Sequence, residues 1–482
     1  MEAAQVKMSG ASSRVRRAVD VRCRGLSDEV TSNRRISGSL DQPRQLGTLT
    51  RHLSWVLGHS KTSFHHSNDA IKLKTNSGDS VSLADLVKET TPPCQLNPLL
   101  FNGHLQTFYT VVKSSDVPVV YKRKLFESEN PNYPGTFAVD FVHRIPSEDP
   151  DTSLPPRTTY FTDQEFGEVG SDDSKPLLVT LHGLSGGSHE IYLRHVLGPL
   201  TSELGWEACV VNSRGCAMSK ITTSIMYNAR ATWDVRQVVN WLRKKFPNRP
   251  LYGIGFSLGA NILTNYLGEE GENCQLKAAV VCSNPWNLEV ASWGLRKSWL
   301  GLEVYQRFMG NNMKKLFERH ADQISKNPDI DPEKIRKIKY LYEFDRALQC
   351  PAWGYPTEAA YYRDASSCDS LLAIRIPLLA INAEDDPISV QDAIPYGEFG
   401  LNPYTVLCAT AMGGHLSWFQ SNGERWFAKA AVAFLDKIAK DIDLDANKPA
   451  PSQNGNGDAS EGKRPVYEPM RRKWHIPKEH AA

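Results

Sequence analysis

The chain has 482 residues, of which 40% are apolar, and it carries a formal net charge of +2 at pH 7. This length fits one large domain with tails, and the small net charge argues against nucleic-acid binding driven by overall charge. No apolar run approaches the roughly 20 residues of a membrane-spanning helix, so the sequence predicts none.

Both ends of the chain are predicted to be disordered tails. Residues 1–75 are rich in Arg, Ser, His and Asn, which predicts a basic tail without a core. Its arginines between residues 14 and 35 resemble a mitochondrial presequence, although its acidic residues argue against that targeting. Residues 46–57 have the pattern of a short amphipathic helix for weak contact with a membrane or lipid-droplet surface. Residues 443–482 are rich in Pro, Asn, Gly, Ser and Lys, and we expect both tails to be dispensable for activity.

Residues 76–442 are predicted to form one domain that opens with a short helix at 82–88. Strand-like segments at 119–124, 137–143 and 158–162 predict an opening antiparallel part of a sheet. Strands and helices then alternate, which is typical of a parallel sheet covered by helices on both faces. The alternating strands are expected at 176–181, 207–211, 250–256, 276–282, 376–382 and 404–408, and the helices at 190–204, 230–245, 258–267 and 423–440.

The alternation is interrupted by about 90 residues, from about 285 to 374, that combine aromatic side chains with charged helical stretches. This is too long for an ordinary connection. We interpret it as a helical cap insertion whose aromatic side chains form an apolar pocket over the site. The alternative is that these side chains are only the core of a small helical subdomain, and the two interpretations are compatible.

The most informative motif is Gly-x-Ser-x-Gly around Ser257, between an apolar strand and a helical pattern. That context is typical of a nucleophile elbow, in which Gly255 and Gly259 let the strand and the helix approach closely. A second match, around Ser185, is followed by paired glycines and only later by a helix, so it predicts a loop. We expect this loop to complete an oxyanion hole, with the backbone N–H groups of Leu184 and Leu258 as donors.

Asp386 and His415 each follow a predicted strand, and with Ser257 they give the chain order Ser, Asp, His. A serine needs an imidazole to take its proton, and the imidazole needs a carboxylate to fix its tautomer. We therefore predict a catalytic triad of Ser257, Asp386 and His415. Asp385 is the alternative carboxylate, and we choose Asp386 because it lies further into the turn.

Metal-dependent hydrolysis is disfavoured, because the sequence has no His-Glu-x-x-His motif and no clustered Cys and His ligands. We predict no metal and no cofactor. The nine cysteines are odd in number and scattered, several of them within apolar runs. They are predicted to be buried reduced thiols, which indicates an intracellular location, in the cytoplasm or at a lipid surface.

Several motifs together resemble one α/β-hydrolase family. They are residues 97–107 (Asn-Pro-Leu-Leu-Phe-Asn-Gly-His-Leu-Gln-Thr), 182–190 (His-Gly-Leu-Ser-Gly-Gly-Ser-His-Glu), 212–215 (Asn-Ser-Arg-Gly), the elbow, 385–387 (Asp-Asp-Pro) and 413–415 (Gly-Gly-His). The family is the type-4 AB hydrolases, which include fungal medium-chain fatty acid ethyl ester synthase/esterases and related lipid hydrolases. The match covers about residues 80–440. Arg214 matches the Arg-Gly pair of the family, with either a structural or a substrate role.

The resemblance implies an α/β-hydrolase fold and a serine esterase or acyltransferase that takes medium-chain acyl esters, or acyl-CoA with an alcohol or water. A monoacylglycerol lipase or phospholipase of the same fold is one alternative. A lipid-binding module without turnover is the alternative of another class, and the complete Ser, Asp and His set favours the enzyme.

Overall fold

The computed structural model describes residues 58–113, 117–144, 151–444, 446, 466–468 and 470–475. The chain divides into two units, Met1–Leu49 and Thr50–Ala482, and the fold described below belongs to the second. The arginine-rich segment and the predicted amphipathic helix at 46–57 lie outside the described residues.

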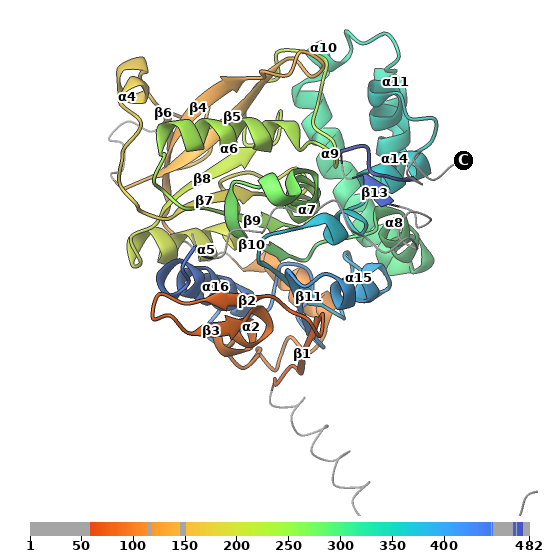
Figure 1. The fold of residues 1–482 in the computed structure, drawn as a ribbon. Helices are drawn as coiled ribbons and strands as arrows, with labels where there is room; N and C mark the ends of the chain where they lie inside the picture. The colour runs from red at the N-terminus through yellow and green to blue at the C-terminus, as the bar shows by residue number, and fades with distance from the viewer. Residues whose placement is uncertain are drawn as a thin grey trace, which may run out of the picture. The chain divides into compact units, whose positions relative to one another are not determined.

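The centre of the fold is a ten-stranded sheet with the order β1-β12-β11-β10-β9-β7-β8-β5-β4-β6 (Figure 1). In that order the strands are Thr62–His66, Thr405–Thr410, Leu378–Ala383, Leu276–Cys282, Leu251–Phe256, Leu177–Leu181, Glu207–Asn212, Thr136–His143, Val120–Glu127 and Thr158–Tyr160. The strands from β12 to β8 are parallel, whereas β1 and β5 pair antiparallel to the strands beside them. The predicted α/β-hydrolase fold class is confirmed. One detail was wrong, since β6 pairs parallel to β4.

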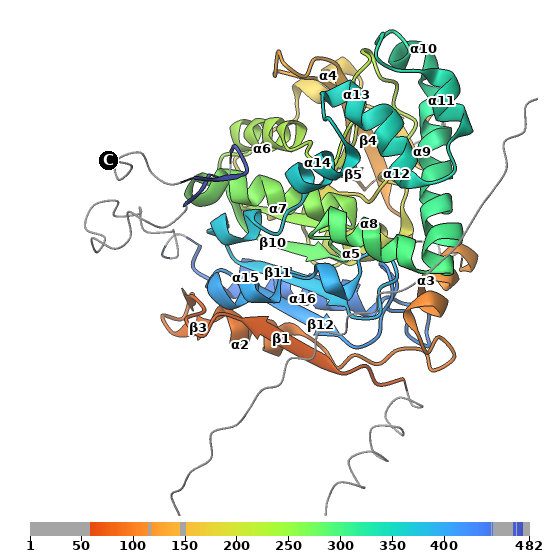
Figure 2. The ribbon, with the colours of Figure 1, turned by 90° about the vertical axis from the view of Figure 1, so that its right-hand side faces the viewer.

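Helices cover both faces because successive side chains of a buried strand point to opposite sides. Val280 packs into one apolar core, and Val281 packs into the other. The first core includes α2 (Leu83–Thr90), α5 (Ile191–Ser202) and α16 (Trp426–Asp441). The second includes α6 (Trp233–Lys245), α7 (Leu258–Glu270) and α15 (Tyr396–Leu401) (Figures 1 and 2). The remaining short elements are β2 (Lys72–Lys74), β3 (Ser80–Ser82), α3 (Gly103–Val112), α4 (Asp163–Gly167), η1 (Gly271–Asn273), η4 (Ser370–Ala373) and η5 (Gln391–Ala393).

The insertion between β10 and β11 is helical, as expected, and it shares an apolar core with the segment between β8 and α6, including Cys216 and Tyr227. Its helices are α8 (Leu288–Lys297), η2 (Leu300–Gln306), α9 (Arg307–Arg319), α10 (Ala321–Ile324), α11 (Pro332–Lys337), α12 (Leu341–Phe344), η3 (Asp345–Gln349), α13 (Cys350–Trp353) and α14 (Glu358–Ala365). Phe344 is buried in the core of the cap. We expected the aromatic side chains of the insertion to form a pocket, but two of them, Trp293 and Trp299, are 53% and 72% exposed.

The boundaries of both predicted tails were also wrong. Within 1–75, strand β1 pairs with β12 over five residues, and the hydroxyl of Ser60 hydrogen-bonds to the backbone of Met412. Within 443–482, β13 (Val466–Glu468) and β14 (Lys473–His475) form a hairpin. Arg472 of this hairpin forms a buried ion pair with Glu269 of α7, with 2.6 Å between Nη2 and Oε1. These segments are stabilised by pairing with the domain rather than by an apolar pattern of their own, so removing residues 1–75 would take away an edge strand.

None of the helices in the described ranges is long and apolar enough to cross a bilayer. The eight cysteines in this part of the chain form no disulfide, and six of them are buried.

Candidate active site

Ser257 lies on the sharp turn between β9 and α7, with a backbone φ of 52°. This conformation is rare for a residue with a side chain. The turn also brings backbone segments very close together at Gly255 and Gly259. A Cβ atom on Gly255 would lie 2.6 Å from the carbonyl oxygen of Gly259, and one on Gly259 would lie 2.4 Å from that of His182. The turn therefore holds the Ser257 hydroxyl at the carboxyl edge of the sheet, where the sequence placed it.

His415 connects Ser257 to Asp386. Its Nε2 lies 2.9 Å from the Ser257 Oγ, and its Nδ1 lies 2.8 Å from Oδ2 of Asp386. Because a carboxylate accepts at Nδ1, the proton of the neutral ring is on Nδ1 and Nε2 is free to accept from the serine. Asp386 is itself fixed, since its Oδ1 accepts the backbone N–H groups of Ile388 and Ser389. The three side chains form one hydrogen-bonded chain.

Asp385 has a different set of contacts. Its Oδ1 accepts the N–H groups of Gly413 and Gly414, which hold the segment before His415. Its Oδ2 is buried without a hydrogen-bond partner among the described residues. Burial is the main reason that the pKa of this carboxyl is raised to about 6. Asp385 therefore positions the histidine loop, whereas Asp386 contacts the imidazole.

The loop after β7 contains the backbone N–H of Leu184, the first of the two predicted oxyanion donors. The N–H of Gly183 donates to the Tyr192 phenol, and that of Ser185 donates to the Tyr227 phenol. Among the described residues, the intervening N–H of Leu184 has no hydrogen-bond partner. Leu258 is the first residue of α7, so its N–H has no acceptor within the helix. These two groups are available as the pair of donors that the sequence predicted.

His182 holds the start of this loop. Its Nε2 accepts the N–H of Ser213, and its Nδ1 donates to the carbonyl of Gly183. Burial lowers the pKa of the imidazole to about 4, so the ring is neutral at physiological pH and acts as a structural bridge.

The segment 97–107 contacts the loops that carry the triad, a role that the sequence did not reveal. Thr107 Oγ1 accepts the backbone N–H of His415 at 2.9 Å. Gly103 packs so closely on Asp385 that a Cβ atom would lie 1.9 Å from its carbonyl oxygen. The amide of Gln106 bridges the carbonyl of Leu100 and the N–H of Phe419. The segment 97–107 therefore holds both the loop that carries Asp385 and the loop that carries His415.

Two other candidates have structural surroundings. Arg214 is buried, and its guanidinium donates to both carboxylate oxygens of Asp234 at 2.9 and 2.7 Å. It therefore stabilises the loop after β8. Ser185 lies on the loop after β7, and in the described part of the chain no hydrogen bond joins its side chain to His415.

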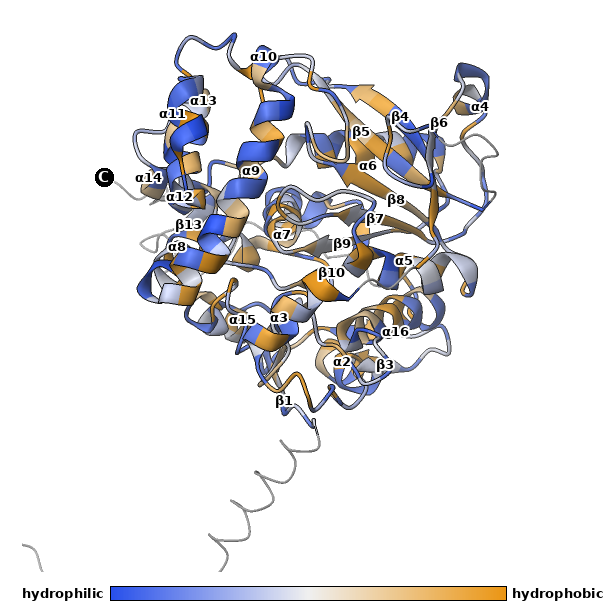
Figure 3. Cartoon of the chain, turned by 180° about the vertical axis from the view of Figure 1, so that it is seen from behind, coloured by the Kyte–Doolittle hydropathy of each residue, from blue (hydrophilic) through white to orange (hydrophobic). Residues whose placement is uncertain are grey.

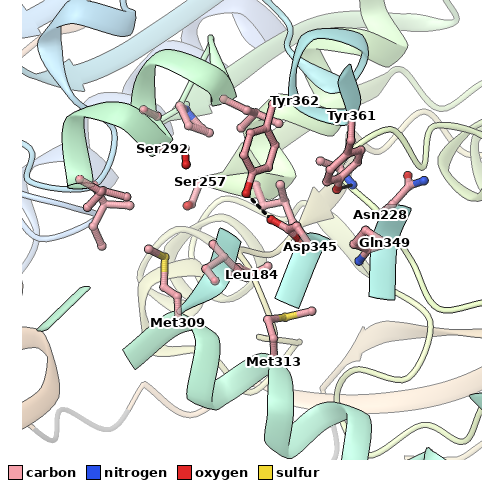
Figure 4. A pocket seen from close by; sticks show the side chains of 18 of the residues that line it. Leu184, Asn228, Ser257, Ser292, Met309, Met313, Asp345, Gln349, Tyr361 and Tyr362 are labelled. Atoms are coloured by element: carbon pink, nitrogen blue, oxygen red, sulfur yellow. Dashed lines mark hydrogen bonds between the residues drawn. The ribbon is translucent and has the colours of Figure 1, made fainter. Parts of the chain in front are cut away.

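Two cavities meet at Ser257. The first lies beneath the cap, and its free space, including the part open to solvent, is about 730 Å³. Its walls are mainly apolar, with Leu184, Met309 and Met313 among them (Figure 4). The second cavity is more polar and contains His415, Lys315 and Arg319. The described residues contain no cluster of His, Cys, Asp and Glu that could hold a metal ion.

The α/β-hydrolase fold family matches residues 176–420, which is just over half of the chain and includes all three residues of the hydrogen-bonded chain. The chain belongs to this family. It is 36% identical to a monoacylglycerol lipase of Saccharomyces cerevisiae over 405 residues, 78% of this chain and 89% of that protein. It is 32% identical to medium-chain fatty acid ethyl ester synthase/esterase 2 of the same yeast over 387 residues, 71% and 85% of the two chains.

A human protein, phospholipase ABHD3, is 31% identical over 269 residues, which cover 55% of this chain and 63% of that protein. The family and these relatives indicate that this α/β-hydrolase is a hydrolase of the esterase and lipase type.

Proposed function

We propose that this α/β-hydrolase is a serine ester hydrolase and acyltransferase of the type-4 group that acts on medium-chain fatty acyl esters. The observation that carries the proposal is the hydrogen-bonded chain Ser257–His415–Asp386 at the junction of an apolar cavity and a polar one. The yeast relatives named for monoacylglycerol and medium-chain ester substrates support the same chemistry.

In the proposed mechanism, Ser257 Oγ attacks the acyl carbonyl carbon while His415 Nε2 takes its proton, and Asp386 stabilises the imidazolium. The N–H groups of Leu184 and Leu258 stabilise the oxyanion. His415 then protonates the leaving oxygen or sulfur, which departs and leaves an acyl-enzyme. Water or an alcohol attacks that ester, gives its proton to His415, and releases acid or new ester with Ser257 restored.

The two cavities give this mechanism an orientation. The general acid must reach the leaving group, and His415 lines the polar cavity but not the apolar one. The leaving group therefore occupies the polar cavity and the acyl chain occupies the apolar cavity. Lys315 and Arg319 lie four residues apart on α9 at the polar side, where they suit the phosphates of acyl-CoA or of a phospholipid.

We expect purified protein to hydrolyse octanoyl-CoA in plain buffer and to form ethyl octanoate when ethanol is abundant. The reason is that a capped apolar site lowers the activity of water around the acyl-enzyme. Chromatography of ethyl ester and free acid, over acyl chains of different length, measures the partition. Rapid release of free acid without ethyl ester at high ethanol would indicate an esterase or lipase that does not transfer the acyl group to alcohol. Absence of any turnover would favour a lipid-binding module.

An exposed apolar rim near the polar cavity supports substrates presented by a lipid surface. We define the rim as Leu99, Phe101, Phe108, Val111, Val112, Trp299, Leu300, Val304 and Phe308. One part of the rim lies on or near α3 and the other on or near η2. The two elements are joined by a hydrogen bond between His104 Nδ1 and the Tyr305 hydroxyl, 2.9 Å apart. α3 lies at one end of α9 (Figures 2 and 3). Val111 and Phe308 also line the polar cavity, so the rim is continuous with the site.

We therefore expect the double variant Val112→Ser/Trp299→Ser to bind phosphatidylcholine vesicles several-fold more weakly than wild type in a flotation assay, because it loses exposed apolar area. Hydrolysis of an ester held in those vesicles should fall in parallel, while hydrolysis of a water-soluble butyryl ester should not. Leu401→Ser is the matched control, since Leu401 on α15 is 72% exposed but lies outside the rim. Equal effects of both variants would contradict a rim-specific contact.

A further inference from the structure

The apolar cavity has a polar patch on its cap wall. η3 is a short π-helical segment that carries Asp345 and Gln349, four residues apart and therefore on one side of the helix. Both side chains line the cavity, although Asp345 is only 6% and Gln349 only 2% exposed. Figure 4 shows Asp345 beside Tyr362 and Gln349 near Asn228, with Ser257 at the same cavity. π-Helical turns are rare and are often found at functional sites.

Among the described residues, the Asp345 carboxylate has one hydrogen-bond partner and no cation paired with it. The Tyr362 hydroxyl donates to its Oδ2 at 2.6 Å, while the adjacent Arg346 pairs with Glu358 instead. Burial raises the pKa of the Asp345 carboxyl to about 7, and the charge of Glu358 adds to this effect. A carboxyl in this state is partly protonated at neutral pH, so it can accept or donate a hydrogen bond.

Gln349 has an unpaired acceptor. Its Nε2 donates to the carbonyl oxygen of Tyr227 at 3.1 Å, so the amide orientation is fixed by an acceptor. Its Oε1 is buried and has no hydrogen-bond partner among the described residues. An unpaired buried acceptor is costly, and Met309, Met313 and Leu341 of the same cavity wall carry no hydrogen-bond donor. A ligand group can supply the missing donor.

We propose that Asp345 and Gln349 form a subsite for a hydroxyl group carried by the acyl chain, so that hydroxy-fatty acyl esters are the preferred substrate class. This inference rests on the proposed function, because the acyl chain is the part of the substrate that occupies this cavity. A hydroxyl donates to Oε1 of Gln349 and exchanges a second hydrogen bond with Asp345. A plain methylene leaves Oε1 of Gln349 unpaired, and a carboxylate places a second negative charge beside Asp345.

The test is a competition between esters of one chain length that differ in a single group. Methyl esters of plain, hydroxylated and carboxyl-terminated acids are compared, with the hydroxyl moved along the chain. At one position the hydroxyl should raise kcat/KM over the plain ester by on the order of 10–100-fold, and the carboxylate should not. A ratio of one at every position would overturn the inference.

Two variants assign the effect to the patch. Gln349→Met removes the unpaired oxygen at similar length and should bring the hydroxy-to-plain ratio close to one. Gln306→Met is the matched control, because Gln306 lines the same cavity but its Oε1 already accepts the N–H of Tyr342, and its ratio should remain high. A ratio that survives Gln349→Met and falls in Gln306→Met would contradict the assignment.

Failure of the subsite is separable from failure of the proposed function. The binding of the same plain and hydroxylated esters to Ser257→Ala protein is measured by calorimetry, which requires no turnover. Tighter binding of the hydroxy ester supports the subsite even if no ester is hydrolysed by wild type. Turnover of plain esters with no hydroxyl preference, in rate or in binding, rejects the subsite and leaves the proposed function intact.

Discussion

Ser257→Ala is expected to lower kcat/KM for an octanoyl ester by about 10,000-fold or more, because the variant loses the atom that forms the acyl-enzyme. Covalent labelling by a fluorophosphonate should disappear with it. The fold should be retained, since only a hydroxyl is removed and, within the described part of the chain, it hydrogen-bonds to His415 alone. Rates, labelling and thermal unfolding of the same preparation measure all three expectations.

Ser185→Ala is the matched control for this experiment, because Ser185 also lies in a Gly-x-Ser-x-Gly sequence and also has a positive φ. It should still be labelled and should retain most of its activity. If labelling followed Ser185 instead, the roles that we assign to the turn after β9 and to the loop after β7 would have to be exchanged.

Asp386→Asn is expected to lower kcat by about 10,000-fold, the effect of such a change in other triads. The amide would favour the wrong tautomer of His415 and could not balance the imidazolium charge. KM for the same ester should change little, since Asp386 is buried behind His415 and lines neither cavity. Steady-state kinetics of the purified variant provides the measurement.

The control, Asp385→Asn, should lose far less activity and should show a distinctive pH dependence of stability. The folded protein raises the pKa of Asp385 from 3.8 to about 6, so it binds more protons than the unfolded chain between these values. The contribution of Asp385 to the free energy of unfolding of wild type is therefore present below about pH 4 and is lost as the pH rises to 6. Denaturant unfolding measures the difference in stability between the variant and wild type. This difference should favour the variant more at pH 7.5 than at pH 4. Equal large losses of activity at 385 and 386 would leave the carboxylate unassigned.

The parts of the fold that could be predicted are those in which the local pattern and the tertiary role coincide. β9 is an apolar run because it is buried on both faces, and Gly255 and Gly259 are needed wherever a strand turns sharply into a helix. Asp386 and His415 follow apolar runs of the same kind. Strands, elbow and triad could therefore all be located from the sequence.

The missed elements depend on contacts with distant parts of the chain. β1 reads Thr-Ser-Phe-His-His and has no strand pattern, and it is an edge strand that forms by pairing with β12. The hairpin of β13 and β14 likewise depends on the ion pair between Arg472 and Glu269. Asp345 and Gln349 are ordinary surface residue types, and only the folded cap reveals that they are buried against the cavity.

The attachment of the His415 loop at three remote points has a consequence for how the enzyme matures. Ser60 reaches Met412 across 352 positions, Thr107 reaches His415 across 308, and Ser257 reaches His415 across 158. Contacts of such sequence separation close large loops and form late in folding. During synthesis Ser257 is made well before His415. Ser60 and Thr107, which hold the His415 loop, lie near the opposite end of the domain in sequence. The nucleophile therefore stays unactivated until the two ends of the domain have met, so that activity appears in a single step at the close of folding.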